Sequence, residues 1–293
     1  MRVIDLWSEK KKPTVSFELY PARDPAAAEK LDKVIDRLAK LEPDFVSVTF
    51  GAGGSTREGS YALVKKLKQE KGLEVVAYFT CWGLGPEQIS AVLDDYRELG
   101  VETILAARGD PPHDQPGFQP HPESLAHASD LIAFIKPRYD FCIACAGYPE
   151  GHVEAASPEK DLEYLKLKVD RGADFVITNY TYDNDLFFAF QKRARALGIE
   201  MPILPGVMPI YSVKMMENLA RLCGASIPDR VRKDLESLDP ADKKAVAAYG
   251  IDLACDLWRG LLRGGAPGIH IYTMDRSKAA VQIVTTLRDE GLL

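Results

Sequence analysis

Residues 73–107 read LEVVAYFTCWGLGPEQISAVLDDYRELGVETILAA, and this stretch sets the expectation for the fold. Two short runs rich in Val, Ile and aromatic residues lie at 73–80 and 101–107. Between them is the helical stretch 86–100, whose final Gly100 is the expected stop before the next strand. The segment therefore predicts a strand, a helix and a second strand, which is the repeating unit of a parallel sheet.

The same alternation continues along the chain. The predicted strands are residues 14–20, 44–50, 73–80, 101–107, 140–147, 174–179, 201–207 and 268–273. Eight such strand-then-helix units favour a closed α/β barrel, the (β/α)8 or TIM barrel. We expect residues 224–265 to add one or two helices before the last strand, and residues 1–293 to form one catalytic barrel domain.

An open, doubly wound sheet is the alternative fold. It would need a glycine-rich phosphate turn after the first strand. The sequence has SFELYPARD at residues 16–24 instead, so the closed barrel is the preferred interpretation.

Composition limits the classes of function. The 43 acidic residues outnumber the 37 basic ones, which argues against a broad nucleic-acid surface. No apolar run is long enough to cross a bilayer, and the opening residues MRVIDLWSEKKKPT lack the apolar core of a signal peptide. Five cysteines without framework spacing suit a reducing compartment, so we expect a cytoplasmic protein with no membrane partner.

In such barrels the chemistry lies at the carboxyl ends of the strands. Because side chains alternate along a strand, Ser16, Glu18 and Tyr20 share one face, and the apolar residues between them share the other. The apolar set should pack outward, which turns Glu18 into the barrel mouth. A partly desolvated carboxyl group there would have a raised pKa and could serve as a general acid near neutral pH. A structural carboxylate paired with an arginine is the alternative.

Two further strand ends offer polar groups. Arg108-Gly109-Asp110 follows the fourth strand and is equally consistent with a clamp on a polar ligand and with a local salt bridge. GAGGST, residues 51–56, could wrap a phosphate with backbone N–H groups. It lacks the lysine of a phosphate-binding loop, so a tight turn is favoured.

Cysteines and histidines indicate no metal site. Cys142 and Cys145 have C-x-x-C spacing, but on one strand they would point to opposite faces. No second pair completes a tetrahedral set and the histidines show no ligand spacing, so we predict buried thiols and no metal. On the helix after the fifth strand, Asp161, Lys166 and Lys168 would by themselves indicate a solvated face.

Several fragments, taken together and in order, resemble the methylenetetrahydrofolate reductase family. They are SFELYPAR (16–23), FVSVTFGAGGSTRE (45–58), ILAARGDPP (104–112), ASDLI (128–132), AGYPEGHVEA (146–155), LKLKVDRGADFVIT (165–178), ILPGVMPI (203–210), CGASIP (223–228) and HIYTMDRS (270–277). The resemblance is collinear and spans nearly the whole chain, which has the length of the family's catalytic barrel alone.

The resemblance implies a reaction, the reduction of 5,10-methylenetetrahydrofolate to 5-methyltetrahydrofolate. It implies FAD as the cofactor, which takes a hydride from NAD(P)H and passes it to the folate. Glu18 matches the family's general acid, which protonates N10 of the folate. Asp110 matches a carboxylate near the flavin and the pterin, where a negative charge favours release of the hydride.

The resemblance also implies binding positions. Those that match the FAD site are Thr49, Arg108, Gly109, Asp110, His127, Ala128, Ala146, Tyr148, His152, Asp161 and Lys168. Those that match the folate site are Glu18, Asn179, Tyr272 and Arg276. Arg108 and Lys168 would supply the cations that the diphosphate needs.

Some positions depart from the family's usual pattern. They are Tyr78 in place of His, His127 in place of Tyr, Asn179 in place of Gln, Thr181 in a normally aromatic stretch, and Val213 in place of an aromatic ring. Loss of a stacking ring removes about 1 kcal/mol of ligand contact. These changes leave the reductant open between NADH, NADPH and a separate electron-transfer subunit, and they bear on how tightly FAD is held. A flavin-free reductase, a folate-binding transferase and a homo-oligomeric assembly also stay open.

Overall fold

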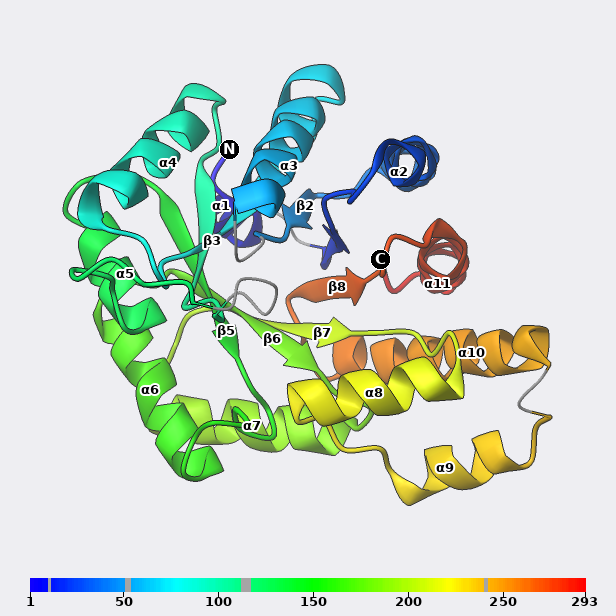
Figure 1. The fold of residues 1–293 in the computed structure, drawn as a ribbon. Helices are drawn as coiled ribbons and strands as arrows, with labels where there is room; N and C mark the ends of the chain where they lie inside the picture. The colour runs from blue at the N-terminus through cyan, green and yellow to red at the C-terminus, as the bar shows by residue number, and fades with distance from the viewer. Residues whose placement is uncertain (10–11, 51–53, 112–116, 240–241) are drawn as a thin grey trace.

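Eight parallel strands close into a barrel in chain order, and helices surround it (Figure 1). The computed structural model describes residues 1–9, 12–50, 54–111, 117–239 and 242–293, the side chains of residues 54–56 excepted. The strands are β1 (Thr14–Leu19), β2 (Phe45–Val48), β3 (Val75–Thr80), β4 (Thr103–Ala107), β5 (Cys142–Gly147), β6 (Phe175–Tyr180), β7 (Ile203–Val207) and β8 (Gly268–Tyr272). The helices are α1 (Val3–Glu9), α2 (Pro25–Ala39), α3 (Gly54–Lys65) with a π-helical turn after it (Lys66–Glu70), α4 (Pro86–Glu98), α5 (Ala128–Ile135), α6 (Pro158–Asp170), α7 (Asn184–Ala196), α8 (Val213–Cys223), α9 (Asp229–Glu236), α10 (Lys243–Arg263) and α11 (Ser277–Asp289).

The (β/α)8 barrel predicted from the sequence is confirmed. β1 pairs in parallel with both β2 and β8, which closes the sheet on itself. The additional helices expected before the last strand are α9 and α10. In the register of the barrel, Glu18 on β1 lies between Ser47 on β2 and Tyr272 on β8. No helix in the described ranges is long and apolar enough to span a bilayer.

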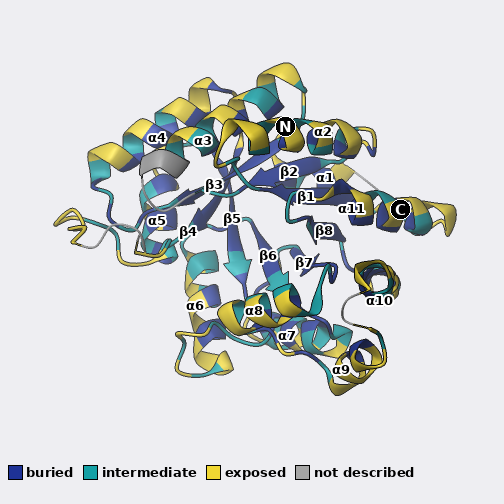
Figure 2. Ribbon diagram, turned by 45° about the vertical axis from the view of Figure 1, so that its right-hand side comes forward, coloured by how far each residue is buried: buried dark blue, intermediate teal, exposed yellow. Residues whose placement is uncertain are grey.

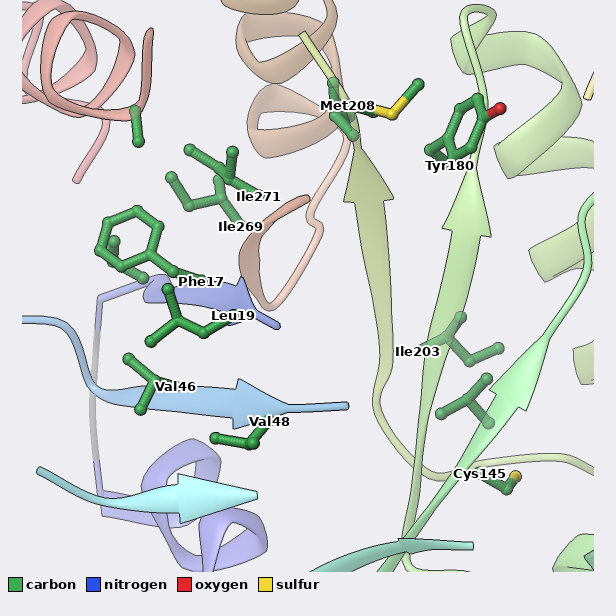
Figure 3. Packing of buried hydrophobic residues seen from close by; sticks show 14 of the residues in the cluster. Phe17, Leu19, Val46, Val48, Cys145, Tyr180, Ile203, Met208, Ile269 and Ile271 are labelled. Atoms are coloured by element: carbon green, nitrogen blue, oxygen red, sulfur yellow. The ribbon is translucent and has the colours of Figure 1, made fainter. Parts of the chain in front are cut away.

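The outward faces of the strands form the main core with the surrounding helices. Phe17 and Leu19 on β1 lie beside Val46 and Val48 on β2 (Figure 3), and all four are buried in this cluster. Burying one such side chain contributes about 1.5–3 kcal/mol. The strands are accordingly buried over most of their length, while the helices expose their outer faces (Figure 2).

A second, inner cluster fills the barrel at the amino ends of the strands. Val3 and Leu6 of α1 belong to it together with Phe175 at the start of β6. Cys142 also lies in this inner cluster, whereas Cys145 packs in the outer one. The two cysteines therefore point to opposite faces of β5, as predicted. The amino ends of the strands are therefore covered by α1.

Trp7 holds α1 against the barrel by a hydrogen bond and an aromatic contact. Its indole Nε1 donates a hydrogen bond to the Pro267 carbonyl at 3.1 Å, and its ring meets that of Phe175 edge-on with 5.0 Å between centroids. We expect Trp7→Phe to lower the free energy of unfolding by about 1 kcal/mol, because the new ring keeps the aromatic contact but cannot donate. Urea unfolding followed by circular dichroism measures this change. An unchanged midpoint would show that the hydrogen bond contributes nothing.

Candidate active site

Glu18 lies at the carboxyl end of β1, with only 3% of its surface exposed. The Tyr20 hydroxyl donates a hydrogen bond to Glu18 Oε1 at 2.7 Å. Tyr78, on β3, donates a second hydrogen bond to the same carboxyl group. The side chain therefore turns into the barrel mouth, as the alternation along β1 predicted. Within the described part of the chain its polar partners are tyrosines and not an arginine.

The surroundings of Glu18 favour a carboxyl group that titrates near neutral pH. Burial raises the pKa of Glu18 to about 7, the hydrogen bonds from Tyr20 and Tyr78 oppose the rise, and the charge of Asp275 adds to it. Burial is also the main cause that raises the pKa of each of the two tyrosines, so both hydroxyls stay protonated and act as donors. Such a carboxyl group can hold a proton at neutral pH and release it, which general acid catalysis requires.

The turn after β8 holds the end of β1 from its other side. The Tyr20 N–H donates to Asp275 Oδ1 at 3.0 Å, and the Thr273 hydroxyl donates to the Glu18 carbonyl at 2.6 Å. Met274 and Asp275 have φ angles of 50° and 54°, in the left-handed region that residues other than glycine rarely adopt. Burial raises the pKa of Asp275, and the Tyr20 N–H opposes this. A second carboxyl group thus acts on Glu18.

A cavity of about 330 Å³ lies beside the ends of β4 and β5, and we call it the β4–β5 cavity. Its wall is built from the ends of these strands, the start of α5, and α6. The predicted cofactor positions that line it are Arg108, His127, Ala128, Ala146, Tyr148, His152, Asp161 and Lys168. The sequence did not single out Ser129, Glu154, Tyr164 and Leu167, which also line it.

Arg108 forms the local salt bridge that the sequence offered as one interpretation, and the clamp on a polar ligand stays a prediction. It lines the β4–β5 cavity, and it forms ion pairs with Asp110 at 3.0 Å and with Glu154 at 2.5 Å. Gly109 follows with a φ of 82°, and a Cβ atom there would lie 2.7 Å from that of Thr80. Only glycine tolerates both the conformation and this close approach, so the Arg-Gly-Asp turn is fixed by its middle residue.

Two lysines on α6 have different surroundings. Lys168 lines the β4–β5 cavity, and its Nζ donates to the Ala146 carbonyl at 2.5 Å. Its charge also lowers the pKa of Asp161, which burial raises. Lys166 instead pairs with Asp170 on the same helix. The solvated face predicted for α6 therefore describes Lys166, while Lys168 belongs to the cavity wall.

The positions assigned to the folate have varied surroundings. Tyr272 is the register neighbour of Glu18, and its hydroxyl donates to a backbone carbonyl of β6 at 2.8 Å. The Asn179 side-chain amide donates to the Cys223 carbonyl at 3.0 Å, at the end of α8. The exposed Arg276 places its guanidinium 4.7 Å from the centre of the Tyr211 ring. Glu18 and Tyr272 are thus adjacent, and Asn179 is bound to the neighbouring helix.

Three predicted cofactor positions, Thr49, Gly109 and Asp110, do not belong to the lining of the β4–β5 cavity. The Thr49 carbonyl accepts a hydrogen bond from the Ser60 hydroxyl, and the Asp110 side chain is 72% exposed at its ion pair with Arg108. Residues 51–53 of the GAGGST motif lie outside the described residues, as do residues 112–116 of the loop after Asp110. The phosphate-turn hypothesis stays a prediction for this reason.

The positions that depart from the family pattern are spread over separate places. Tyr78 contacts Glu18, and His127 precedes α5 at the wall of the β4–β5 cavity. The buried Thr181 hydroxyl accepts a hydrogen bond from the Asp183 N–H at 3.1 Å, just before α7. Val213 lines a second cavity, of about 310 Å³, between α8 and α9.

The sequence did not identify two residues, Tyr20 and Asp275, as groups that act on Glu18. Tyr20 lies two residues further along the same strand face, so alternation alone could have identified it as a partner. Asp275 is distant in sequence and comes near only because β8 pairs with β1. Its position just after a strand was the one available signal.

The cysteines and histidines of the described ranges form no metal site. No three His, Cys, Asp or Glu side chains in these ranges gather closely enough to hold a metal ion. All five cysteines are free, and burial raises the pKa of Cys142 to about 12. A thiol that stays protonated is a poor ligand and a poor nucleophile.

Comparison with known proteins identifies the family of the chain. A family model described as methylenetetrahydrofolate reductase matches residues 3–288. The chain is 36% identical over 301 residues to methylenetetrahydrofolate reductase (NADH) 1 of Arabidopsis thaliana. This alignment covers 98% of this chain and 51% of the plant protein. It is also 36% identical over 273 residues to 5,10-methylenetetrahydrofolate reductase of Escherichia coli (strain K12), covering 93% of this chain and 90% of the bacterial protein.

The chain thus spans about half the length of the plant relative and most of the bacterial one. Among solved structures, an uncharacterized protein from Clostridium thermocellum that binds two copies of 5-methyl-5,6,7,8-tetrahydrofolic acid superposes with a TM-score of 0.67. The identity is 16%, over 98% of this chain and 99% of that one, so this likeness supports the fold alone. The family model and the sequence relatives together show that the chain belongs to the methylenetetrahydrofolate reductase family.

Proposed function

We propose that the chain reduces 5,10-methylenetetrahydrofolate to 5-methyltetrahydrofolate, with FAD as cofactor and Glu18 as the proton donor. The observation that carries this proposal is a carboxyl group buried at the barrel mouth, with its pKa raised to about 7, in a member of this family. The reaction needs a proton at N10, so that the bridging ring opens, and a hydride at the methylene carbon. Glu18 is placed to supply the first of these.

The β4–β5 cavity suits a dinucleotide cofactor by the chemistry of its wall. Arg108 and Lys168 bring two cations to it, which a diphosphate requires. Tyr164 and Leu167 bring apolar surface that is 49% and 39% exposed, and unusually exposed apolar groups in a concave wall favour a planar ligand. When bound, FAD would supply the hydride for the folate.

The residues of the mouth would hold the folate and the proton. In its acid form Glu18 donates to N10, and the hydroxyls of Tyr20 and Tyr78 keep the carboxyl group in one orientation. Tyr272, beside Glu18, lies near enough to Tyr148 of the cavity wall for Tyr148 to raise its pKa. The proton donor and the β4–β5 cavity therefore belong to one face of the barrel.

The remaining positions implied by the family are assigned by the same proposal. Asn179, Tyr272 and Arg276 are assigned to the folate. Asp110, ion-paired with Arg108, is assigned to the rim of the cofactor site, where its charge disfavours a further negative charge on the ligand.

Spectra of the purified chain, followed by anaerobic titration, test the proposal. We expect the visible absorbance of an oxidised flavin, its loss with NADH or NADPH, and its return with methylenetetrahydrofolate. Loss with dithionite but with neither nicotinamide would indicate a separate protein as the reductant. Folate reduction by a preparation without flavin would overturn the FAD assignment, and folate binding without any reduction would favour a transferase.

The wild-type enzyme should lose activity on the alkaline side of neutrality. The folate step needs the protonated form of Glu18, which is lost as the pH rises through its pKa of about 7. We expect the rate of this step to be constant at lower pH and to fall about tenfold for each further pH unit above that value. Stopped-flow oxidation of the reduced flavin by methylenetetrahydrofolate measures it. A rate that is independent of pH across neutrality would argue against Glu18 as the acid.

A further inference from the structure

The end of β1 and the turn after β8 are joined by a continuous set of hydrogen bonds. Tyr20 takes part twice, because its hydroxyl donates to Glu18 Oε1 at 2.7 Å and its N–H donates to Asp275 Oδ1 at 3.0 Å. The Thr273 hydroxyl donates to the Glu18 carbonyl at 2.6 Å and accepts from the Asp275 N–H at 3.2 Å. Glu18 and Asp275 are therefore held in a fixed relation, with Tyr20 between them.

The backbone of this turn is strained where Asp275 lies. Met274 and Asp275 are consecutive non-glycine residues at positive φ, a conformation that is costly for residues with a side chain. Glu42 is the one other non-glycine residue in this region of φ within the described ranges. Such strain persists where the surrounding structure requires a particular placement. Here the strained turn brings the carboxyl group of Asp275 to Tyr20, the residue that follows β1.

We propose that Tyr20 and Asp275 are positioning residues for Glu18 that act on it in opposite directions. The Tyr20 hydroxyl orients the carboxyl group and favours its ionised form. The negative charge of Asp275 favours the neutral, proton-bearing form. This inference rests on the proposed function, because it concerns the residue assigned there as the proton donor.

The other groups near Glu18 do not reverse this balance. Within the described ranges they are Ser47 from β2, Tyr78 from β3, Tyr272 from β8 and Cys223 from the end of α8. None of them is a cation, so none stabilises the ionised carboxylate by charge. Tyr78 donates a hydrogen bond as Tyr20 does, and the Tyr272 hydroxyl is bound to β6. Asp275 is the acidic residue that raises the pKa of Glu18, in addition to burial.

Two conservative substitutions separate the two influences. Tyr20→Phe removes the hydroxyl donor and keeps the ring, so the pKa of Glu18 should rise and the alkaline limb of the folate step should move to higher pH. The rate on the acidic plateau should fall about tenfold, because the carboxyl group loses a donor that orients it. Asp275→Asn removes the charge but keeps an oxygen to accept the Tyr20 N–H, so the limb should move to lower pH with the plateau retained.

The chain offers a matched control pair. On α10 and α9, the Tyr249 hydroxyl donates to Asp234 Oδ2 at 2.9 Å, which is the same kind of contact on the outside of the barrel. Tyr249→Phe and Asp234→Asn should leave both the plateau and the alkaline limb at their wild-type values. Thermal unfolding of all four variants checks that each is folded before its profile is compared.

A second measurement does not depend on turnover. The infrared carbonyl band of protonated Glu18 gives the titration of this residue directly. The band is isolated by subtracting the spectrum of the same protein that also carries Glu18→Gln. Opposite displacements of this titration in Tyr20→Phe and Asp275→Asn are the expected result. Displacements in the same direction, or none in either variant, would overturn the inference.

The two proposals fail in different ways. If the wild-type chain reduces no folate, the proposed function fails, and the infrared titration still decides whether Tyr20 and Asp275 act on Glu18. If the wild-type chain shows an alkaline limb that Glu18→Gln abolishes, but neither variant displaces it, the proposed function stands and this inference fails.

Discussion

Glu18→Gln is expected to slow the proposed folate step by about 10²–10⁴-fold, while NADH, NADPH or dithionite still reduces the flavin at the wild-type rate. Glutamine has nearly the same shape, and its carbonyl oxygen can still accept the hydrogen bond that Tyr20 gives to Oε1. It has no acidic proton to transfer to N10, so the loss should be confined to the step that consumes the proton. Stopped-flow measurement of the two half-reactions separates the steps.

Glu102→Gln provides the control for this experiment. Glu102 lies just before β4, at the opposite end of the barrel, where it pairs with the amino-terminal ammonium group. Both half-reactions of this variant should match the wild type. If Glu18→Gln reduced folate within about tenfold of the wild-type rate, general acid catalysis by Glu18 would be wrong, because a positioned acid contributes more than that.

Local patterns in the sequence were sufficient to predict the barrel and the direction of Glu18. Strands of this barrel are buried on their outer face by helices and on their inner face by one another, so apolar runs mark them clearly. The alternation along β1 separates Glu18 from Phe17 and Leu19, and the structure buries those two against the helices. Both predictions depend only on neighbours along the chain.

Two contacts at the strand ends depend on residues far apart in the sequence. Asp275 reaches Tyr20 across 255 positions because β8 closes the barrel onto β1. The hydrogen bond from the Asn179 amide to the Cys223 carbonyl depends on where α8 ends. Neither contact has a local pattern, since nothing near Asn179 or Asp275 indicates which partner the fold will bring to it.

Arg108 has two interpretations in the sequence, and the structure shows one of them, the salt bridge. In the structure it is ion-paired with Asp110 and Glu154 and also lines the β4–β5 cavity. An anionic ligand bound there would compete with these two carboxylates for the same guanidinium. Lys168 has no such ion pair among the described salt bridges, so its charge is the simpler one to test.

Lys168→Met is expected to raise the dissociation constant of FAD by about 10–100-fold. Methionine has a similar length and keeps the packing of the stem on α6, but it removes the charge that a diphosphate would contact. It also removes the hydrogen bond to the Ala146 carbonyl and the cation that lowers the pKa of Asp161. The neighbouring acid then stays in the cavity without its cation, which further disfavours an anionic ligand. Quenching of flavin fluorescence on titration with the apoprotein measures the constant.

Lys166→Met is the matched control, because Lys166 lies on the same helix and pairs with Asp170 instead of lining the cavity. Its removal changes the net charge by the same amount, so a general electrostatic effect would weaken FAD binding in both variants alike. A loss of affinity limited to Lys168→Met therefore locates the diphosphate at the β4–β5 cavity. If the two variants lost the same affinity, or neither lost any, Lys168 would be a structural lysine and the cofactor would have to be held by other residues.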